Sequence, residues 1–270
     1  MSARSRRRAA TFIARTSAPA PLDALAAHAA HAARPRFDRL DALRGAAIVW
    51  MAAFHFSFDL NYFRVIQQDF YRSPVWTVQR ACIVTLFMLC VGAGQGIAAA
   101  QGQSLARFWK RVAQIAGCAL LVSLGSLMMF PASFISFGVL HAIALLLIVV
   151  RFTTCALGAW RWPLGLVAIL LPLVVADPFF DTRWTNWVGL TTHKPVTEDY
   201  APILPWLGVV WWGAAAAEWI LARRPSLFQG RLPSAARPLA VLGRWSLSFY
   251  MLHQPVLIGL LWLATTLLRR

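Results

Sequence analysis

Long apolar segments are the feature that most constrains what this chain can fold into. Seven segments are long enough, or nearly long enough, to cross a bilayer, which takes roughly 20 apolar residues per helix. They cover about residues 42–62, 78–98, 110–130, 136–153, 158–176, 202–221 and 242–267. Of the 270 residues, 59% are hydrophobic and 13% are charged, about half the charged fraction of a soluble domain. The sequence therefore predicts an all-α, polytopic transmembrane helix bundle with about seven helices.

The distribution of basic residues predicts how the bundle is oriented. A net charge of +16 would also be compatible with nucleic-acid binding. Most arginines and lysines, however, lie in the N-terminal tail and in every second loop between the predicted spans, and the other loops carry fewer. The longest of the other loops, 177–201, instead carries four acidic residues. By the positive-inside rule, the N-terminus is expected inside and the C-terminus outside, with the lipid bilayer rather than nucleic acid as the partner.

Two polar segments lie outside the predicted spans. Residues 1–36 are rich in Ala and Arg and lack the apolar core of a secretory signal, so we expect a disordered, basic cytoplasmic tail that favours anionic lipid. A transit peptide is the alternative. Residues 223–238 contain three prolines and several arginines, which is typical of a flexible cytoplasmic linker. Residues 37–270 are predicted to form one transmembrane domain.

The first predicted span carries four ionisable residues, Asp41, Arg44, His55 and Asp59. At 100° per residue they share an arc of roughly 60°, spread over about 27 Å of helix axis. A charge that faces lipid near the bilayer centre costs roughly 3 kcal/mol. This side of the helix is therefore expected to face the interior of the bundle and to line a route through most of the membrane.

His55 and Asp59 lie one turn apart on this helix. A histidine beside a carboxylate can hold a proton near neutral pH, and it suits the general base for an acceptor hydroxyl or amine. The alternative is a His–Asp pair that only fastens helices together. His141 lies near the outer end of the fourth span, and His253 shares a side of the seventh span with Tyr250. Such clusters either join helices or position a substrate.

Three further patterns have simpler interpretations. The four cysteines form no CxxC pair and are interpreted as packing residues, so no metal site is predicted. The sequence VGAGQG satisfies G-x-x-x-G inside an apolar helix, which favours helix–helix contact over a close approach to a ligand. Tryptophan and tyrosine in the loop 177–201 are typical of interfacial anchors. A sugar held at the outer mouth is the alternative for that loop.

Several blocks of the sequence are similar to a known family. The run RLDALRGAAIVWMAAFH, followed by DLNYF and LFMLCVGAG, resembles the bacterial members of the heparan-alpha-glucosaminide N-acetyltransferase catalytic-domain family. FGVLHAIAL and LGRWSLSFYMLHQPVL resemble its later blocks, and the resemblance covers about residues 36–267. The ten residues between Arg44 and His55 also resemble the arginine–histidine pair of the acyltransferase-three membrane enzymes.

The resemblance implies an acyltransferase in the bacterial cytoplasmic membrane. Such an enzyme would move an acyl group, usually acetyl, from cytoplasmic acetyl-CoA to a carbohydrate or glycoconjugate acceptor on the outer side. The implied residues for binding the donor are Arg44, Asp41 and Arg111. The implied catalytic residues are His55 as base or transient acyl carrier, Asp59 orienting it, and His141 and His253 on the acceptor side.

One departure from the family pattern affects these roles. In the animal lysosomal members the catalytic histidine follows the first helix of the domain, but residues 63–71 contain no histidine here. His55 would have to take that role. Two other functions stay open, a proton-coupled transporter and a non-catalytic membrane subunit, although the sequence lacks the inverted repeats typical of transporters. A homodimer is one of the assemblies considered.

Overall fold

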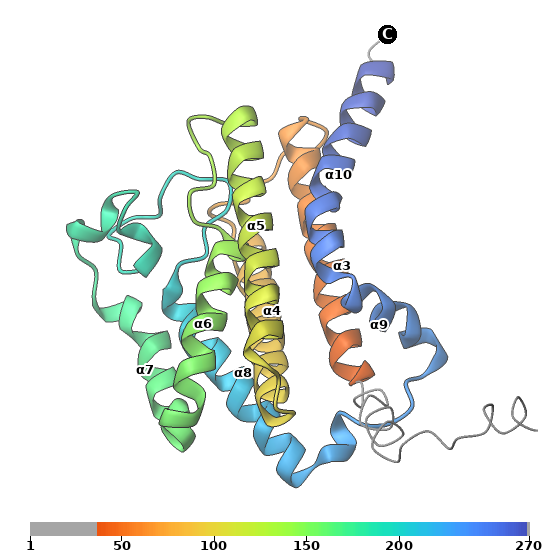
Figure 1. The fold of residues 1–270 in the computed structure, drawn as a ribbon. Coiled ribbons are helices and arrows are strands. Elements are labelled where there is room, and N and C mark those ends of the chain that lie inside the picture. The colour runs from red at the N-terminus through yellow and green to blue at the C-terminus, as the bar shows by residue number, and fades with distance from the viewer. Residues whose placement is uncertain (1–36, 269–270) are drawn as a thin grey trace, which may run out of the picture. The chain divides into compact units, whose positions relative to one another are not determined.

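The computed structural model describes residues 37–268, which form α-helices joined by loops and short 3₁₀ helices (Figure 1). The long helices are α3 (Asp38–Tyr62), α4 (Pro74–Ala100), α5 (Leu105–Met129), α6 (Val139–Leu157), α7 (Arg161–Val174), α8 (Ile203–Arg223) and α10 (Ser246–Leu268). A short helix, α9 (Arg237–Arg244), precedes α10. The 3₁₀ helices are η1 (Gly158–Trp160), η2 (Pro178–Asp181), η3 (Asn186–Val188), η4 (Pro225–Leu227) and η5 (Ser234–Ala236).

The predicted all-helical membrane bundle is confirmed, and the protein is an integral membrane protein. Five helical stretches in residues 37–268 are long and apolar enough to cross a bilayer. One of them, Val139–Val174, covers most of both the fourth and the fifth predicted spans. The chain turns between these two helices at Gly158, which has a φ of +49°. The remaining predicted span is α3, whose charged residues lower its mean hydropathy.

Glycines on α4 bring this helix against α8. A Cβ atom added at Gly92 would lie 2.1 Å from the carbonyl oxygen of Val210, and one added at Gly96 would lie 2.7 Å from that of Ala214. Because no side chain larger than hydrogen fits at these positions, the two backbones can pack directly against each other. This agrees with the interpretation of the VGAGQG sequence as a helix-contact motif.

A second close crossing joins α3 to α9. A Cβ atom at Gly243 would lie 1.8 Å from the carbonyl oxygen of Asp41, so α9 lies directly against the first turns of α3. Arg244, at the end of α9, reaches Asp38 at 2.8 Å and approaches Asp41 at 3.7 Å. This contact fixes the end of α3 that carries Asp41 and Arg44.

The connections rich in basic residues lie at one end of the bundle. The α4–α5, α6–α7 and α8–α9 connections are together at the lower end in Figure 1, and the loops that follow α3, α5 and α7 are at the other end. The placement of the N-terminus inside and the C-terminus outside stays a prediction. The predicted tail, 1–36, lies outside the described residues. The predicted linker contains η4 and η5, and Arg39 donates hydrogen bonds to the carbonyl groups of Ser226 and Leu227.

Candidate functional site

An inner cavity of about 270 Å³ lies between α3, α4, α5, α6 and α10. Its wall combines apolar side chains such as Phe87 and Ile143 with a small set of polar groups. The polar residues that line it are Arg44, Gln95, Gln103, Arg111, Ser246 and Tyr250. Cavities of this character, apolar with a few convergent polar groups, are the usual form of a small-molecule site.

Two arginines from different helices meet at this cavity. Arg44 projects from α3, and its Nη1 donates a 2.8 Å hydrogen bond to Asp41. Arg111 projects from α5. The Arg44 guanidinium lies beside Gly94 of α4, because a Cβ atom built there would be in ordinary van der Waals contact with it, at 3.6 Å. Two guanidinium groups in one cavity suit phosphate, which arginine binds through paired hydrogen bonds.

Two histidines distant in sequence meet where α3 packs against α10. The ring centroids of His55 and His253 are 5.2 Å apart in an edge-on arrangement. Phe249 stacks on His253 in parallel, with 5.9 Å between ring centroids. Tyr250, one turn before His253 on α10, has its ring 5.7 Å away and also lines the cavity. The imidazole pair therefore adjoins the cavity wall.

The hydrogen bonds of His253 fix which of its nitrogens carries the proton. Nδ1 lies 2.7 Å from the carbonyl oxygen of Tyr250. Because a carbonyl oxygen can only accept, Nδ1 carries the hydrogen and the lone pair of the neutral ring is on Nε2. Within residues 37–268, Nε2 is buried and has no hydrogen-bond partner. His253 is thus held in the tautomer that a proton acceptor requires.

Asp59 is buried, at 3% exposure, on the side of α3 that faces α10. This agrees with the prediction that the ionisable residues of α3 face the bundle interior. Asp59 Oδ1 accepts a 2.7 Å hydrogen bond from Gln254 on α10. In the described part of the chain, no hydrogen bond joins Asp59 to His55. The carboxylate is therefore placed to tie α3 to α10, beside the histidine pair.

His141 lies apart from the other two intramembrane histidines. Its Nδ1 accepts a hydrogen bond from the backbone N–H of Gly138 at 3.2 Å, so Nε2 carries the hydrogen and donates to Ser123 Oγ, also at 3.2 Å. Among the described residues, no ring contact joins it to His55 or His253. Both nitrogens of His141 are occupied, and its contacts fasten the start of α6 to α5.

Asp199 is a site residue that sequence reasoning missed, because it was one of four acidic residues in a loop. Its carboxylate accepts a 2.7 Å hydrogen bond from the N–H of Val139 at the first turn of α6. It also accepts a hydrogen bond from the hydroxyl of Tyr250. The side chain of the cavity residue Tyr250 is thus held from the loop that joins α7 to α8. Burial raises the pKa of Asp199 above its ordinary value.

We expect Asp199→Asn to change how stability depends on pH. Because the folded protein raises the pKa of Asp199, its stabilising contribution is full below the unfolded pKa and is lost as pH rises through the folded pKa. Asparagine keeps an oxygen for Val139 but does not ionise. The difference obtained by subtracting the wild-type Tm from the variant Tm should therefore become more positive as the pH is raised from about 4 to about 8. A Tm difference that is constant over this range would contradict the prediction.

A model of the family described as "Heparan-alpha-glucosaminide N-acetyltransferase, catalytic" matches residues 36–255. The chain belongs to this family. The matched residues include both cavity arginines, the His55–His253 pair and Asp199. Membership of the heparan-alpha-glucosaminide N-acetyltransferase family indicates a membrane acetyltransferase. The relation to the acyltransferase-three enzymes stays a prediction. Comparison with curated proteins and with solved structures found no match.

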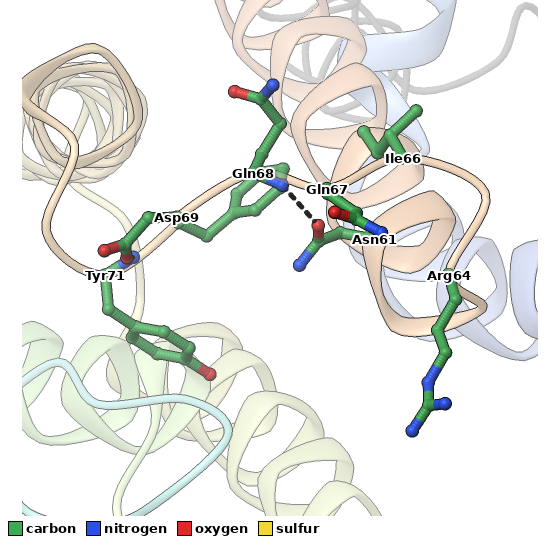
Figure 2. Close-up of a pocket in the computed structure, with 8 residues that line it drawn as sticks. Asn61, Arg64, Ile66, Gln67, Gln68, Asp69 and Tyr71 are labelled. Carbon is green, nitrogen blue, oxygen red and sulfur yellow. Dashed lines mark hydrogen bonds between the residues drawn. The ribbon is translucent and has the colours of Figure 1, made fainter.

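The residues matched by this N-acetyltransferase family model also border an open surface hollow of about 690 Å³ at the opposite end of α3 from Arg44. It is formed by the last turn of α3 and the loop that follows (Figure 2). The residues that line it are Asn61, Arg64, Ile66, Gln67, Gln68, Asp69, Phe70 and Tyr71. Sequence reasoning considered this stretch only for its lack of a histidine. The run of amide, acidic and aromatic residues from 67 to 71 was the sequence pattern that could have drawn attention to this stretch.

Proposed function

We propose that the chain transfers an acetyl group from cytoplasmic acetyl-CoA to a carbohydrate or glycoconjugate acceptor at the outer face of the bacterial cytoplasmic membrane. One observation carries this proposal. The inner cavity is lined by two guanidinium groups, and its wall adjoins a pair of imidazoles, one with a buried, unpartnered nitrogen. His55 lies eleven residues after Arg44, about 16 Å further along the helix axis. Phosphate binding and proton transfer would thus take place at different depths of the membrane.

Arg44 and Arg111 would hold the phosphates of the donor. Their guanidinium groups line the same cavity from α3 and α5, and charge-assisted hydrogen bonds to phosphate are among the stronger polar contacts in proteins. Asp41 would act on the donor indirectly, because it carries the same sign of charge as phosphate. Its hydrogen bond to Arg44 supports a positioning role. The acetyl thioester would extend from these arginines toward Tyr250.

His253 would accept the proton of the acceptor through Nε2. The acceptor hydroxyl or amine then attacks the thioester carbonyl carbon, the carbon–sulfur bond breaks, and the CoA thiolate leaves and takes up a proton. His55 would lie beside the reacting groups, with its ring in edge-on contact with that of His253. Holding both reactants in an enclosed, low-dielectric site would supply much of the rate. The hydrogen bonds of Asp59 and His141 support positioning and structural roles for these two residues.

Arg111→Ala tests the donor site. We expect the KM for acetyl-CoA to rise roughly tenfold or more, because a charge-assisted contact to phosphate is lost. The measurement is release of the CoA thiol by purified protein, with glucosamine as the acceptor probe. Arg107→Ala is the matched control, since Arg107 is exposed one turn earlier on α5 and does not line the cavity.

Two results would contradict the proposed function. Wild-type protein that releases no CoA thiol in the presence of glucosamine and shows no thermal stabilisation by CoA would exclude an acetyl-CoA site. Proton-gradient-driven uptake into proteoliposomes without CoA binding would instead support the transporter.

A further inference from the structure

Gln95 is a buried amide whose nitrogen has no partner within the bundle. It lies in α4 among buried apolar neighbours such as Ala93 and Ile97, and it is 5% exposed. Its Nε2 atom is buried and has no hydrogen-bond partner within residues 37–268. Buried amides in proteins are nearly always hydrogen-bonded. An apolar side chain of the same length would fill this position without that cost, so packing does not explain why it carries an amide.

The amide lies at the same level of the inner cavity as the two arginines. Gln95 lines this cavity together with Arg44 and Arg111. It follows Gly94, where a Cβ atom would lie 3.6 Å from the Arg44 guanidinium. Gln95 is five residues before the end of α4, and Arg111 is six residues after the start of α5. Both are therefore about 8 to 9 Å from the helix ends that the α4–α5 connection joins.

The positive charge at this level is only partly balanced. The guanidinium groups of Arg44 and Arg111 are close enough to repel each other. Asp41 accepts a hydrogen bond from Arg44, whereas Arg111 has no hydrogen bond or ion pair in the part of the chain that the structure describes. None of the described aspartates and glutamates lines the cavity. This level of the cavity therefore favours an anion.

A carboxamide beside two guanidinium groups suits such an anion. It adds a hydrogen-bond donor without adding to the repulsion between the positive charges. The terminal torsion of a glutamine side chain is broad, so the amide can turn its nitrogen toward a ligand in the cavity. The backbone that carries it is fixed, because a Cβ atom at Gly96, the next residue, would lie 2.7 Å from the carbonyl oxygen of Ala214 in α8.

We propose that Gln95 binds the acetyl donor: its amide nitrogen donates a hydrogen bond to a phosphate oxygen that Arg44 and Arg111 also hold. This inference rests on the proposed function, and it adds a neutral ligand to the phosphate site. Gln95 would not touch the acetyl group. Its role is to raise the affinity for a thioester that carries phosphate, and a thioester without phosphate would gain nothing from it.

Gln95→Met tests the hydrogen bond, because methionine keeps the length of the side chain and removes the donor. Binding is measured by thermal stabilisation of purified protein in uncharged detergent, with CoA and with 3′-phosphoadenosine 5′-diphosphate, the nucleotide part of CoA. We expect the affinity for both probes to fall about tenfold, because the lost contact is to a charged group. Gln114→Met is the matched control, since Gln114 is exposed on α5 and does not line the cavity.

Gln95→Glu tests whether this side chain lies within reach of the arginines. A carboxylate at position 95 would take the place of the phosphate and pair with the guanidinium groups. We therefore expect Tm without ligand to be maintained and the affinity for CoA to fall roughly 100-fold or more. If the arginines were out of reach, the unpaired buried charge would lower Tm sharply, and that result would overturn the inference.

Two binding results would also overturn it. One is an unchanged CoA affinity in Gln95→Met, and the other is a loss confined to CoA, which would assign Gln95 to the pantetheine arm instead. CoA thiol release in the presence of glucosamine separates this inference from the proposed function. Weaker nucleotide binding in Gln95→Met, without thiol release by wild type, would leave the phosphate ligand standing and reject acetyl transfer. Thiol release by wild type, with an unchanged KM for acetyl-CoA in Gln95→Met, would do the reverse.

Discussion

His253→Asn should lower the rate of acetyl transfer by roughly 100- to 10,000-fold, the usual contribution of a general base. The reason lies in the two nitrogens of the ring. Nδ1–H is committed to the carbonyl oxygen of Tyr250, and Nε2 is the buried atom left to accept a proton. The asparagine amide can still donate to that carbonyl, so the contact within α10 is kept. The variant has no group that can accept the proton.

The measurement is CoA thiol release with saturating acetyl-CoA, together with thermal stabilisation by CoA. Stabilisation should equal that of wild type, because His253 does not line the inner cavity where the arginines lie. His193→Asn is the control, since this histidine is exposed in the loop between α7 and α8 and contacts Thr192 and Asp181. Full transfer activity in His253→Asn would show that Nε2 is not the proton acceptor.

Gly92→Leu should lower stability by about 3 kcal/mol or more. A Cβ atom at this position would lie 2.1 Å from the carbonyl oxygen of Val210. The obstacle is backbone, so no side-chain rotation can relieve it. The α4–α8 contact would have to open, and α4 also carries the cavity residues Gly94 and Gln95. Donor affinity should therefore fall together with stability.

Gly117→Leu on α5 is the matched control for this prediction. No atom lies within 4 Å of a Cβ atom built at Gly117. Leucine there should be neutral or stabilise the helix by up to about 1 kcal/mol, because glycine is a poor helix former. Tm values measured in the same detergent decide the comparison. Similar losses in both variants would mean that bulk in any helix, rather than the α4–α8 contact, sets the effect.

Much of the fold follows from local sequence. Apolar length located the membrane helices, and helical spacing placed Asp41, Arg44, His55 and Asp59 on one side of α3. That side faces the interior, with Asp59 buried and Arg44 at the cavity. The short helix α9 was not anticipated. It falls where apolar periodicity is too brief to define an element.

The partners of each site residue were harder to predict. Spacing suggested that Asp59 orients His55, because the two lie one turn apart. In the structure, Asp59 instead accepts a hydrogen bond from Gln254, and the residue that contacts His55 is His253. Both partners are separated in sequence from α3 by nearly the whole membrane domain. Tertiary contacts of this kind leave no periodic trace in one sequence. Asp199 is similar, since a loop carboxylate gives no local sign that it caps α6 and holds Tyr250.

The contact between Asp59 and Gln254 joins positions 195 residues apart. During synthesis, α10 leaves the ribosome last among the described helices, and until it inserts, α3 lacks the surface that completes the imidazole pair. Contacts this distant in sequence also form late in folding, because the intervening chain must first be ordered. A half-translated polypeptide can thus hold the arginine end of the bundle without His253, so under the proposed function it would bind the donor but have no group to accept the proton in acetyl transfer.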